Sequence, residues 1–215
     1  MNQTRRDFIK KSSAIGVSSL LPFNKNLFKM KAKIRTAHIG VGGMGLNDLK
    51  AISSHKNVLV TALCDVDSNL LNQAHKLFPK AKIFKDYRVL LNNLEREIDA
   101  VVISTPDHTH GPASIMALKK GKAIYCQKPL TNNVIDAREM SKISSQKKLV
   151  TQMGIQVHSF YDYKLAKLLI QEDVIGKIHT VRAWSPKNWG FDGKISKKED
   201  KIPDNLDWNL WLGNS

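Results

Sequence analysis

Short apolar runs alternate with amphipathic helical patterns between residues 34 and 154. Five runs have the length and composition of buried strands: Ile34–Ile39, Val58–Cys64, Ala100–Ser104, Ala123–Cys126 and Leu149–Met153. Four intervening segments have the pattern of helices: Gly45–Ser53, Ser68–Phe78, Pro112–Lys120 and Asn133–Ser145. Ala81–Phe84 and Asp86–Leu94 add a further strand and a short helix. Because such alternation is typical of a parallel sheet with helices on both faces, the pattern predicts an α/β fold with a doubly wound, Rossmann-type sheet.

The pattern changes after Gly154, where we expect a second unit. Tyr161–Glu172 is predicted to be a helix, and Ile178–Ser185 alternates like a half-buried strand. Residues 186–206 have the composition of a loop, and the chain closes with the apolar segment Leu206–Gly213. All the tryptophans lie in this last part: Trp184, Trp189, Trp208 and Trp211. This clustering supports a unit distinct from the sheet.

The N-terminus has the pattern of an export signal. Thr4–Lys10 places two arginines before a large apolar pair and a lysine, as in twin-arginine signals. Ser12–Leu21 is mildly apolar and too short to span a bilayer, so no ordinary membrane span is expected. The segment predicts transport of the folded protein by the twin-arginine export machinery to a periplasmic or extracytoplasmic location. A basic tail with a chance pair of arginines is the alternative, and no clear cleavage site follows.

The composition excludes some classes of protein. The net charge is +15, but the excess lies partly in residues 1–33 and is otherwise scattered over helices. The chain has no arginine-rich stripe, zinc-finger spacing or set of stacking aromatics, so nucleic acid is not a predicted partner. Cys64 and Cys126 lie far apart in apolar runs, outside any Cys-x-x-Cys spacing. We expect them to line the core, and no metal site is predicted.

A glycine-rich loop follows the first predicted strand and opens a helix. Gly40 permits a tight turn, Gly42 lets a pyrophosphate approach the backbone, and Gly45 permits close contact between helix and strand. Asp65 ends the second strand, where a carboxylate can accept hydrogen bonds from both ribose hydroxyls. Its charge repels a 2′-phosphate, and residues 66–68 contain no arginine to neutralise one. The arrangement predicts a dinucleotide site that prefers NAD(H) to NADP(H).

Two later predicted strands end in side chains that could bind a ligand or take part in catalysis. Counting Ala81–Phe84 as the third strand, Ser104–His110 ends the fourth predicted strand and Cys126–Leu130 ends the fifth, both at the edge where α/β sheets bind ligands. Lys128 precedes a proline that fixes the backbone, so its cation is predicted to project towards the cleft; an ordinary surface lysine is the alternative. His110 is interpreted mainly as a helix-capping residue, with direct catalysis as the second possibility.

Together these motifs resemble the glucose–fructose oxidoreductase and inositol dehydrogenase (Gfo/Idh/MocA) family. The similarity covers residues 34–215 and includes the Gln-x-His-Ser motif of exported members, within Met153–Ser159. It implies hydride exchange between NAD and a carbon of a sugar or cyclitol. It also implies that full-length relatives are homo-oligomers. The cofactor-binding residues implied by the motifs are Gly40, Gly42, Gly43, Met44, Gly45, Asp65, Thr105, Pro106, His110, Gln127, Lys128 and Gln156.

The resemblance assigns Lys128 as the catalytic residue, beside the substrate hydroxyl and the nicotinamide. Two positions depart from the family pattern. Gln127 stands where the family usually has glutamate, which removes a charge near Lys128, and Ile155 stands where close relatives commonly have asparagine. Some relatives cleave glycosidic bonds through a transient keto intermediate, so glycoside cleavage stays open as an alternative activity.

These inferences divide the chain into three parts: residues 1–33 as signal and linker, 34–154 as the NAD-binding domain, and 155–215 as an incomplete α+β substrate domain. Family members usually continue past the Asp207–Gly213 motif. Since the sequence stops at Ser215, we expect a fragment, a disrupted gene product or a naturally short relative. The 215-residue chain alone is expected to bind NAD without turning over sugars. A non-catalytic remnant of the family is the remaining alternative.

Overall fold

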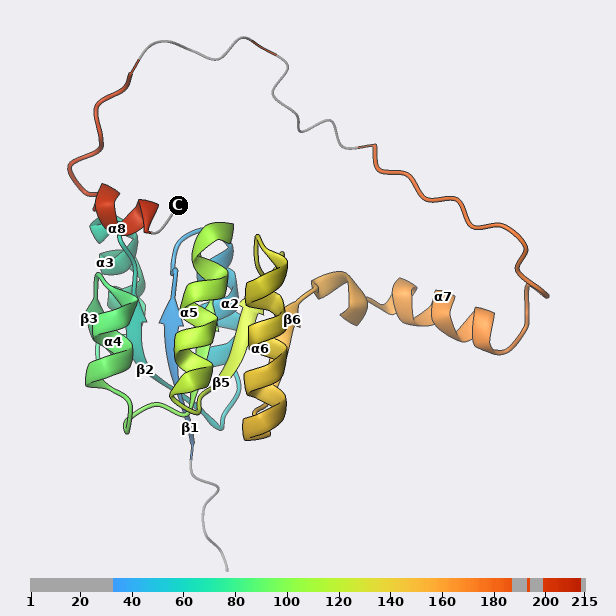
Figure 1. Ribbon diagram of the computed structural model, residues 1–215, viewed down its shortest axis with the longest axis horizontal. Helices are drawn as coiled ribbons and strands as arrows, with labels where there is room; N and C mark the ends of the chain where they lie inside the picture. The colour runs from blue at the N-terminus through green and yellow to red at the C-terminus, as the bar shows by residue number, and fades with distance from the viewer. Residues whose placement is uncertain (1–32, 187–192, 194–198, 214–215) are drawn as a thin grey trace, which may run out of the picture. The chain divides into compact units, whose positions relative to one another are not determined.

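The computed structural model describes residues 33–186, 193 and 199–213 (Figure 1). The twin-arginine segment and Trp189 lie outside these residues. Six parallel strands form one sheet in the order β3-β2-β1-β4-β5-β6. Their bounds are β1 (Ile34–Ile39), β2 (Val58–Cys64), β3 (Lys82–Phe84), β4 (Ala100–Ile103), β5 (Ala123–Gln127) and β6 (Thr151–Gly154). This strand order defines a doubly wound Rossmann-type sheet, so the predicted fold class is confirmed.

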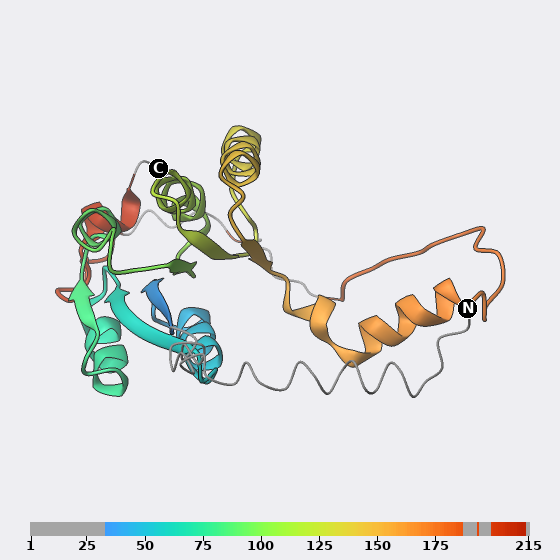
Figure 2. The same ribbon diagram turned by 90° about the horizontal axis from the view of Figure 1, so that it is seen from below.

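Helices cover both faces of the sheet. They are α2 (Met44–Ser53), α3 (Ser68–Leu77), α4 (Tyr87–Asn93), α5 (Asp107–Lys119) and α6 (Val134–Lys147). Figures 1 and 2 place α4, α5 and α6 on one face and α2 and α3 on the other. Each face has its own apolar cluster, one containing Leu90, Leu118 and Met140 and the other Leu49 and Leu71. Strands β2, β4 and β5 are largely apolar because helices cover both faces of the sheet.

The two cysteines lie in the core, as predicted. Cys64 and Cys126 are free, buried and part of the cluster beneath α4, α5 and α6. Burial among apolar side chains raises the pKa of the Cys126 thiol to about 11. Within the described residues, no group of three or more His, Cys, Asp or Glu side chains is arranged to hold a metal ion.

Two predicted elements differ from the structure. Helix α5 begins at Asp107, five residues before the predicted start at Pro112. The prediction took Pro112 as the first helical residue, but the helix tolerates it near its N-terminus, where few intrahelical bonds are lost. Ile178–Ser185 is exposed and forms no strand, so that prediction is wrong. A strand is stable only when a neighbouring strand pairs with its backbone groups, and the sheet formed by the described residues does not include this segment.

Three short helical elements follow the sheet. They are the 3-10 helix η2 (Gln156–Ser159), α7 (Tyr161–Gln171) and α8 (Trp208–Leu212). Helix α7 confirms the predicted helix near these bounds, and every residue in it is exposed. Among the described residues, none of the helices combines the length and apolarity that a membrane crossing requires. The domain boundaries at residues 33 and 154 stay predictions.

A buried histidine makes the stability of this sheet depend on pH. His38 lies in β1 with 1% of its surface exposed, and its Nε2 is 3.1 Å from the Thr36 hydroxyl. Its Nδ1 has no hydrogen-bond partner. Burial lowers the pKa of His38 to about 3, whereas an unfolded histidine titrates near about 6.5. The unfolded chain therefore binds more protons between these values, and stability falls as the pH drops through about 6.5.

We expect the free energy of unfolding to fall by about 2 kcal/mol between pH 8 and pH 5 through His38 alone. His38→Gln, which cannot titrate, should remove that part of the pH dependence. Urea unfolding at the two pH values measures it. His179→Gln, at an exposed position, is the control and should leave the dependence unchanged. An unaltered pH dependence in His38→Gln would show that His38 is not its source.

Candidate functional site

The candidate site lies at the carboxyl edge of the sheet, where the strand order reverses. Strands β1 and β4 are neighbours there, with Ile39 opposite Ile103, but their chains continue to opposite sides. Such a reversal opens a crevice above the strand ends. Ser104 N–H donates to the Ile39 carbonyl at 2.8 Å and so joins the exits of β4 and β1, and Gly40 N–H donates to the Cys64 carbonyl at 2.8 Å and joins the exit of β1 to the end of β2.

At Gly40 and Gly45 the glycine loop leaves no space for a side chain larger than a hydrogen atom. Gly40 has φ of +80°, and a Cβ atom there would lie 2.5 Å from the Ser104 carbonyl oxygen. A Cβ atom on Gly45 would lie 2.1 Å from the Gly40 carbonyl oxygen. The loop therefore packs backbone against backbone and brings the N-terminus of α2 to the crevice. No side chain caps that helix terminus, so its N–H groups and partial positive charge are suited to a phosphate group.

Asp65 follows the last residue of β2, and its carboxylate is hydrogen-bonded to the glycine loop. Its Oδ2 accepts a hydrogen bond from Val41 N–H at 2.8 Å, and its Oδ1 accepts one from Asp67 N–H at 3.0 Å. Burial raises the pKa of Asp65 above its usual value, although these N–H groups oppose the effect. A carboxylate has further lone pairs, so it can still accept from a ribose. The loop and the carboxylate form one rigid unit.

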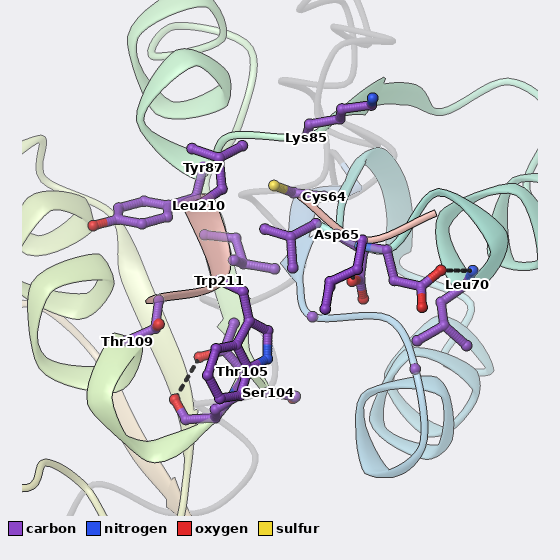
Figure 3. Close-up of a pocket in the computed structure, with 17 residues that line it drawn as sticks. Cys64, Asp65, Leu70, Lys85, Tyr87, Ser104, Thr105, Thr109, Leu210 and Trp211 are labelled. Atoms are coloured by element: carbon purple, nitrogen blue, oxygen red, sulfur yellow. Dashed lines mark hydrogen bonds between the residues drawn. The ribbon is translucent and has the colours of Figure 1, made fainter. Parts of the chain in front are cut away.

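A pocket with a cavity volume of about 370 Å³ opens between this unit and the end of β4 (Figure 3). Five predicted site residues line it: Gly40, Gly42, Asp65, Thr105 and Pro106. Sequence reasoning missed other lining residues, of which the most informative are Lys85, Tyr87, Leu206, Leu210 and Trp211. Leu206, Leu210 and Trp211 belong to the tryptophan-bearing segment near the C-terminus, which the sequence singled out. Nothing in the spacing of that segment indicated that it lies at this pocket. Lys85 gave no signal beyond its position after β3.

Other predicted residues lie along the same edge but outside that pocket. Gln127 ends β5 and is buried, and its Nε2 donates to Asp48 Oδ2 at 2.8 Å. Ser104 Oγ donates to the same oxygen at 2.7 Å. This explains the amide where the family usually has an acid, because a glutamate here would face the Asp48 carboxylate at hydrogen-bond distance, and two such charges repel. Gln127 thus connects β5 to α2.

His110 lies in the first turns of α5, beneath the two strand tips. Its ring is 1% exposed, with Nδ1 2.6 Å from the Pro129 carbonyl oxygen and Nε2 2.8 Å from the Thr105 carbonyl oxygen. It lies inside the helix, whose cap is Pro106, so the capping interpretation is wrong. The ring ties the segment after Lys128 to the tip of β4. Its role as a cofactor-binding residue stays a prediction.

Lys128 is exposed at the tip of β5. Within the described part of the chain, no hydrogen bond or ion pair engages its ammonium group. Beside this strand, Gly154 pairs with Gln127 in the register of β5 and β6. Gln156 follows in η2, and its Nε2 lies 3.8 Å from the sulfur of Met44 at the start of α2. Gln156 and Met44 therefore meet, and Gln127 is joined to the strand that leads to Gln156.

The residues present fit a dinucleotide. A glycine cradle that a Cβ atom at Gly40 or Gly45 would fill faces a helix N-terminus, a carboxylate ends the neighbouring strand where a ribose would be held, and the adjoining pocket is largely apolar. These features define a dinucleotide-binding Rossmann domain. Residues 34–155 match the family model described as the GFO_IDH_MocA oxidoreductase family with an NAD-binding Rossmann fold. The chain belongs to this family, and its cofactor is NAD.

The chain is similar to several curated proteins. It is 36% identical over 132 residues to a glycosyl hydrolase family 109 protein of Stenotrophomonas maltophilia, covering 57% of this chain and 29% of the relative. It is 29% identical over 175 residues to inositol 2-dehydrogenase of Rhodococcus jostii, covering 79% and 47%. The chain thus spans less than half the length of these relatives.

Solved structures share the fold. The myo-inositol 2-dehydrogenase of Lactobacillus plantarum superposes with a TM-score of 0.63 at 27% identity, over 68% of this chain and 43% of that one. The WlbA dehydrogenase of Bordetella pertussis, in complex with NADH and UDP-GlcNAcA, gives 0.62 at 23% identity, over 69% and 42%. At that lower identity the likeness is one of fold.

Proposed function

We propose that this protein is an NAD-dependent oxidoreductase that transfers hydride between the cofactor and a carbon of a sugar, cyclitol or sugar derivative. The observation that supports the proposal is that Lys128 is exposed directly after β5, whose last residue, Gln127, is hydrogen-bonded to Asp48 of α2. The similarity to inositol 2-dehydrogenases supports a polyhydroxylated ring as substrate.

The residues divide the work of the reaction. When bound, NAD supplies the hydride acceptor or donor at nicotinamide C4. Gly40, Gly42 and the α2 N-terminus would hold its pyrophosphate, and Asp65 its adenosine ribose. As the carbonyl forms, the uncharged Lys128 amine would accept the proton of the reacting hydroxyl, and the resulting ammonium group would release that proton to water; in the reverse direction the ammonium group would donate a proton to the carbonyl oxygen. The bond network of Gln127, Asp48 and Ser104 keeps the tips of β4 and β5 in place while this happens.

The test is NADH formation, followed at 340 nm, with myo-inositol and a panel of hexoses and amino sugars. It is run on the 215-residue chain and on any longer in-frame product of the gene. We expect substrate-dependent NADH from the longer product and NAD binding from both. Tight NAD binding without turnover of any polyol by either protein would contradict the proposal.

Glycoside cleavage is a second candidate function, favoured by the similarity to the glycosyl hydrolase family 109 protein. Release of nitrophenol from a panel of nitrophenyl glycosides distinguishes the two. Cleavage that requires bound NAD but yields no net NADH would support this candidate. Net NADH from a free polyol would support the dehydrogenase.

The proposal includes export by the twin-arginine route, which rests on Thr4–Lys10. Replacement of both arginines by lysine should retain the protein in the cytoplasm. Cell fractionation of the two forms measures this. Equal periplasmic amounts would contradict it.

The preference for NAD over NADP should depend on Asp65. Asp65→Ala should weaken NAD binding about tenfold through loss of charged hydrogen bonds. It should also reduce the difference between the affinities for NAD and for NADP. Removing the carboxylate leaves Lys85 in the same pocket, where its cation attracts a 2′-phosphate. Isothermal titration calorimetry with both cofactors measures the two affinities.

Two further variants identify the cause of that change. Asp65→Asn removes the charge but retains one acceptor, so it should gain NADP affinity with a smaller loss of NAD affinity. Adding Lys85→Met to Asp65→Ala should reverse the gain. Equal affinities for the two cofactors in the unaltered protein would refute the role of Asp65.

A further inference from the structure

The C-terminal segment lies against the first half of the Rossmann domain, although more than one hundred residues separate the two in sequence. From its docking we propose that Asn205–Leu212 closes the adenosine half of the NAD site, with the Trp211 indole as the wall against which adenine stacks. This inference rests on the proposed function only in that it needs the dinucleotide to bind.

One end of the segment is fixed to the turn between β2 and α3. Ser68 N–H donates to the Asn205 carbonyl at 2.9 Å, and Asp207 N–H donates to the Val66 carbonyl at 3.0 Å. Between these bonds, Leu206 pairs with Asp67 as an isolated antiparallel bridge. The turn is the one that follows the ribose acid, Asp65. The segment is therefore held by main-chain bonds directly beside the position expected for the ribose.

The other end is fixed to the start of α5. The Trp211 carbonyl oxygen lies 2.6 Å from His108 Nε2, and the two rings meet edge to face with centroids 5.2 Å apart. Asp207 caps the short helix by accepting from Leu210 N–H at 3.1 Å, and the Trp208 ring stacks on Trp211 at 4.9 Å. The segment thus spans from β2 to α5.

Between these attachments the segment presents apolar side chains to the pocket. Leu206, Leu210 and Trp211 line it together with Asp65 and Thr105, as the close-up shows for Leu210 and Trp211 (Figure 3). A ribose held by Asp65 leaves its base in this space. An aromatic ring with leucines beside it offers the flat apolar surface on which a purine stacks, an interaction worth about 1–3 kcal/mol per base.

The C-terminal segment would then have a role in binding the cofactor. Residues after the sheet would then complete the cofactor site as well as any substrate site. The anchors are specific to this function, because they join the segment to the two loops that flank the adenosine position. A segment that only covered apolar surface would need no contact with the ribose turn.

The test is the affinity of the full chain for ADP-ribose, which contains the adenosine half of NAD without nicotinamide. Trp211→Ala should weaken binding of ADP-ribose and of NAD by about tenfold, equivalent to ~1.4 kcal/mol. Trp211→Phe should restore the affinity to within about threefold, because phenylalanine keeps a stacking face. Trp184→Ala, at a position 83% exposed, is the matched control and should bind as the unaltered protein does.

A second measurement does not depend on the stability of the alanine variant. A protein that retains only Trp211, with phenylalanine at positions 184, 189 and 208, should lose indole emission when ADP-ribose binds. Unchanged emission on saturation, or equal ADP-ribose affinity for folded Trp211→Ala and the unaltered chain, would overturn the inference. Failure of the unaltered chain to bind either NAD or ADP-ribose would instead refute the dinucleotide site itself.

Discussion

Replacing Lys128 by methionine is expected to lower turnover by about two to four orders of magnitude, the usual contribution of a positioned proton-transfer group. Methionine retains the length of the side chain but neither donates a hydrogen bond nor carries charge. Because Lys128 is exposed and engages no other described side chain, its loss should leave the fold intact. Affinity for NAD should stay within about threefold, since the pyrophosphate and adenosine contacts lie elsewhere.

Steady-state kinetics on the form of the protein that turns over a polyol measure this effect. A parallel fall in kcat and kcat/KM would mean that the lysine acts mainly in the transition state. Lys142→Met, at an exposed position on α6, is the control for removing a surface cation. Unchanged turnover in Lys128→Met would return Lys128 to the role of an ordinary surface lysine.

Replacing Gly45 by alanine is expected to weaken NAD binding about a hundredfold and to lower the free energy of unfolding by roughly 3 kcal/mol, the upper range for overpacking. The added Cβ atom would lie 2.1 Å from the Gly40 carbonyl oxygen and 2.8 Å from its carbon. Both are backbone atoms, so only displacement of the loop or of α2 relieves the clash. Either movement takes the helix N-terminus away from the pyrophosphate.

Two other glycine variants separate this backbone clash from the general effect of alanine. At Gly42 a Cβ atom would meet the Leu70 side chain, which can move, so Gly42→Ala should lose NAD affinity with little loss of stability. At Gly111, inside α5, a Cβ atom would meet Asp136 Oδ2, and NAD affinity should be unchanged. Isothermal titration and urea unfolding measure both quantities. If Gly45→Ala bound NAD normally, the loop would not have the role assigned to it.

The sequence by itself determined the sheet, the glycine cradle and the family. Buried parallel strands appear as nearly continuous apolar runs because both of their faces are covered, which is why β2 matches its predicted bounds. Strand β1 also matches its predicted bounds, although it contains Arg35, Thr36 and His38. The close packing at Gly40 and Gly45 and the position of Asp65 at the end of β2 were also predicted, since they depend on backbone geometry within one strand–turn–helix unit and on the end of the next strand. These constraints act between residues that are close in sequence, so the spacing of the motif is enough to predict them.

Only the tertiary structure decided which distant residues meet. Gln127 could not be paired with Asp48, nor His110 with the Pro129 carbonyl, because sequence spacing does not specify contacts between separate strand tips and helices. Ile178–Ser185 has the alternation of a strand but is not part of the sheet that the described residues form, because alternation alone does not place a segment beside a neighbouring strand. Trp211 lines the same pocket as Asp65, because main-chain bonds of Asn205 and Asp207 join its segment to the turn after Asp65, more than one hundred residues earlier.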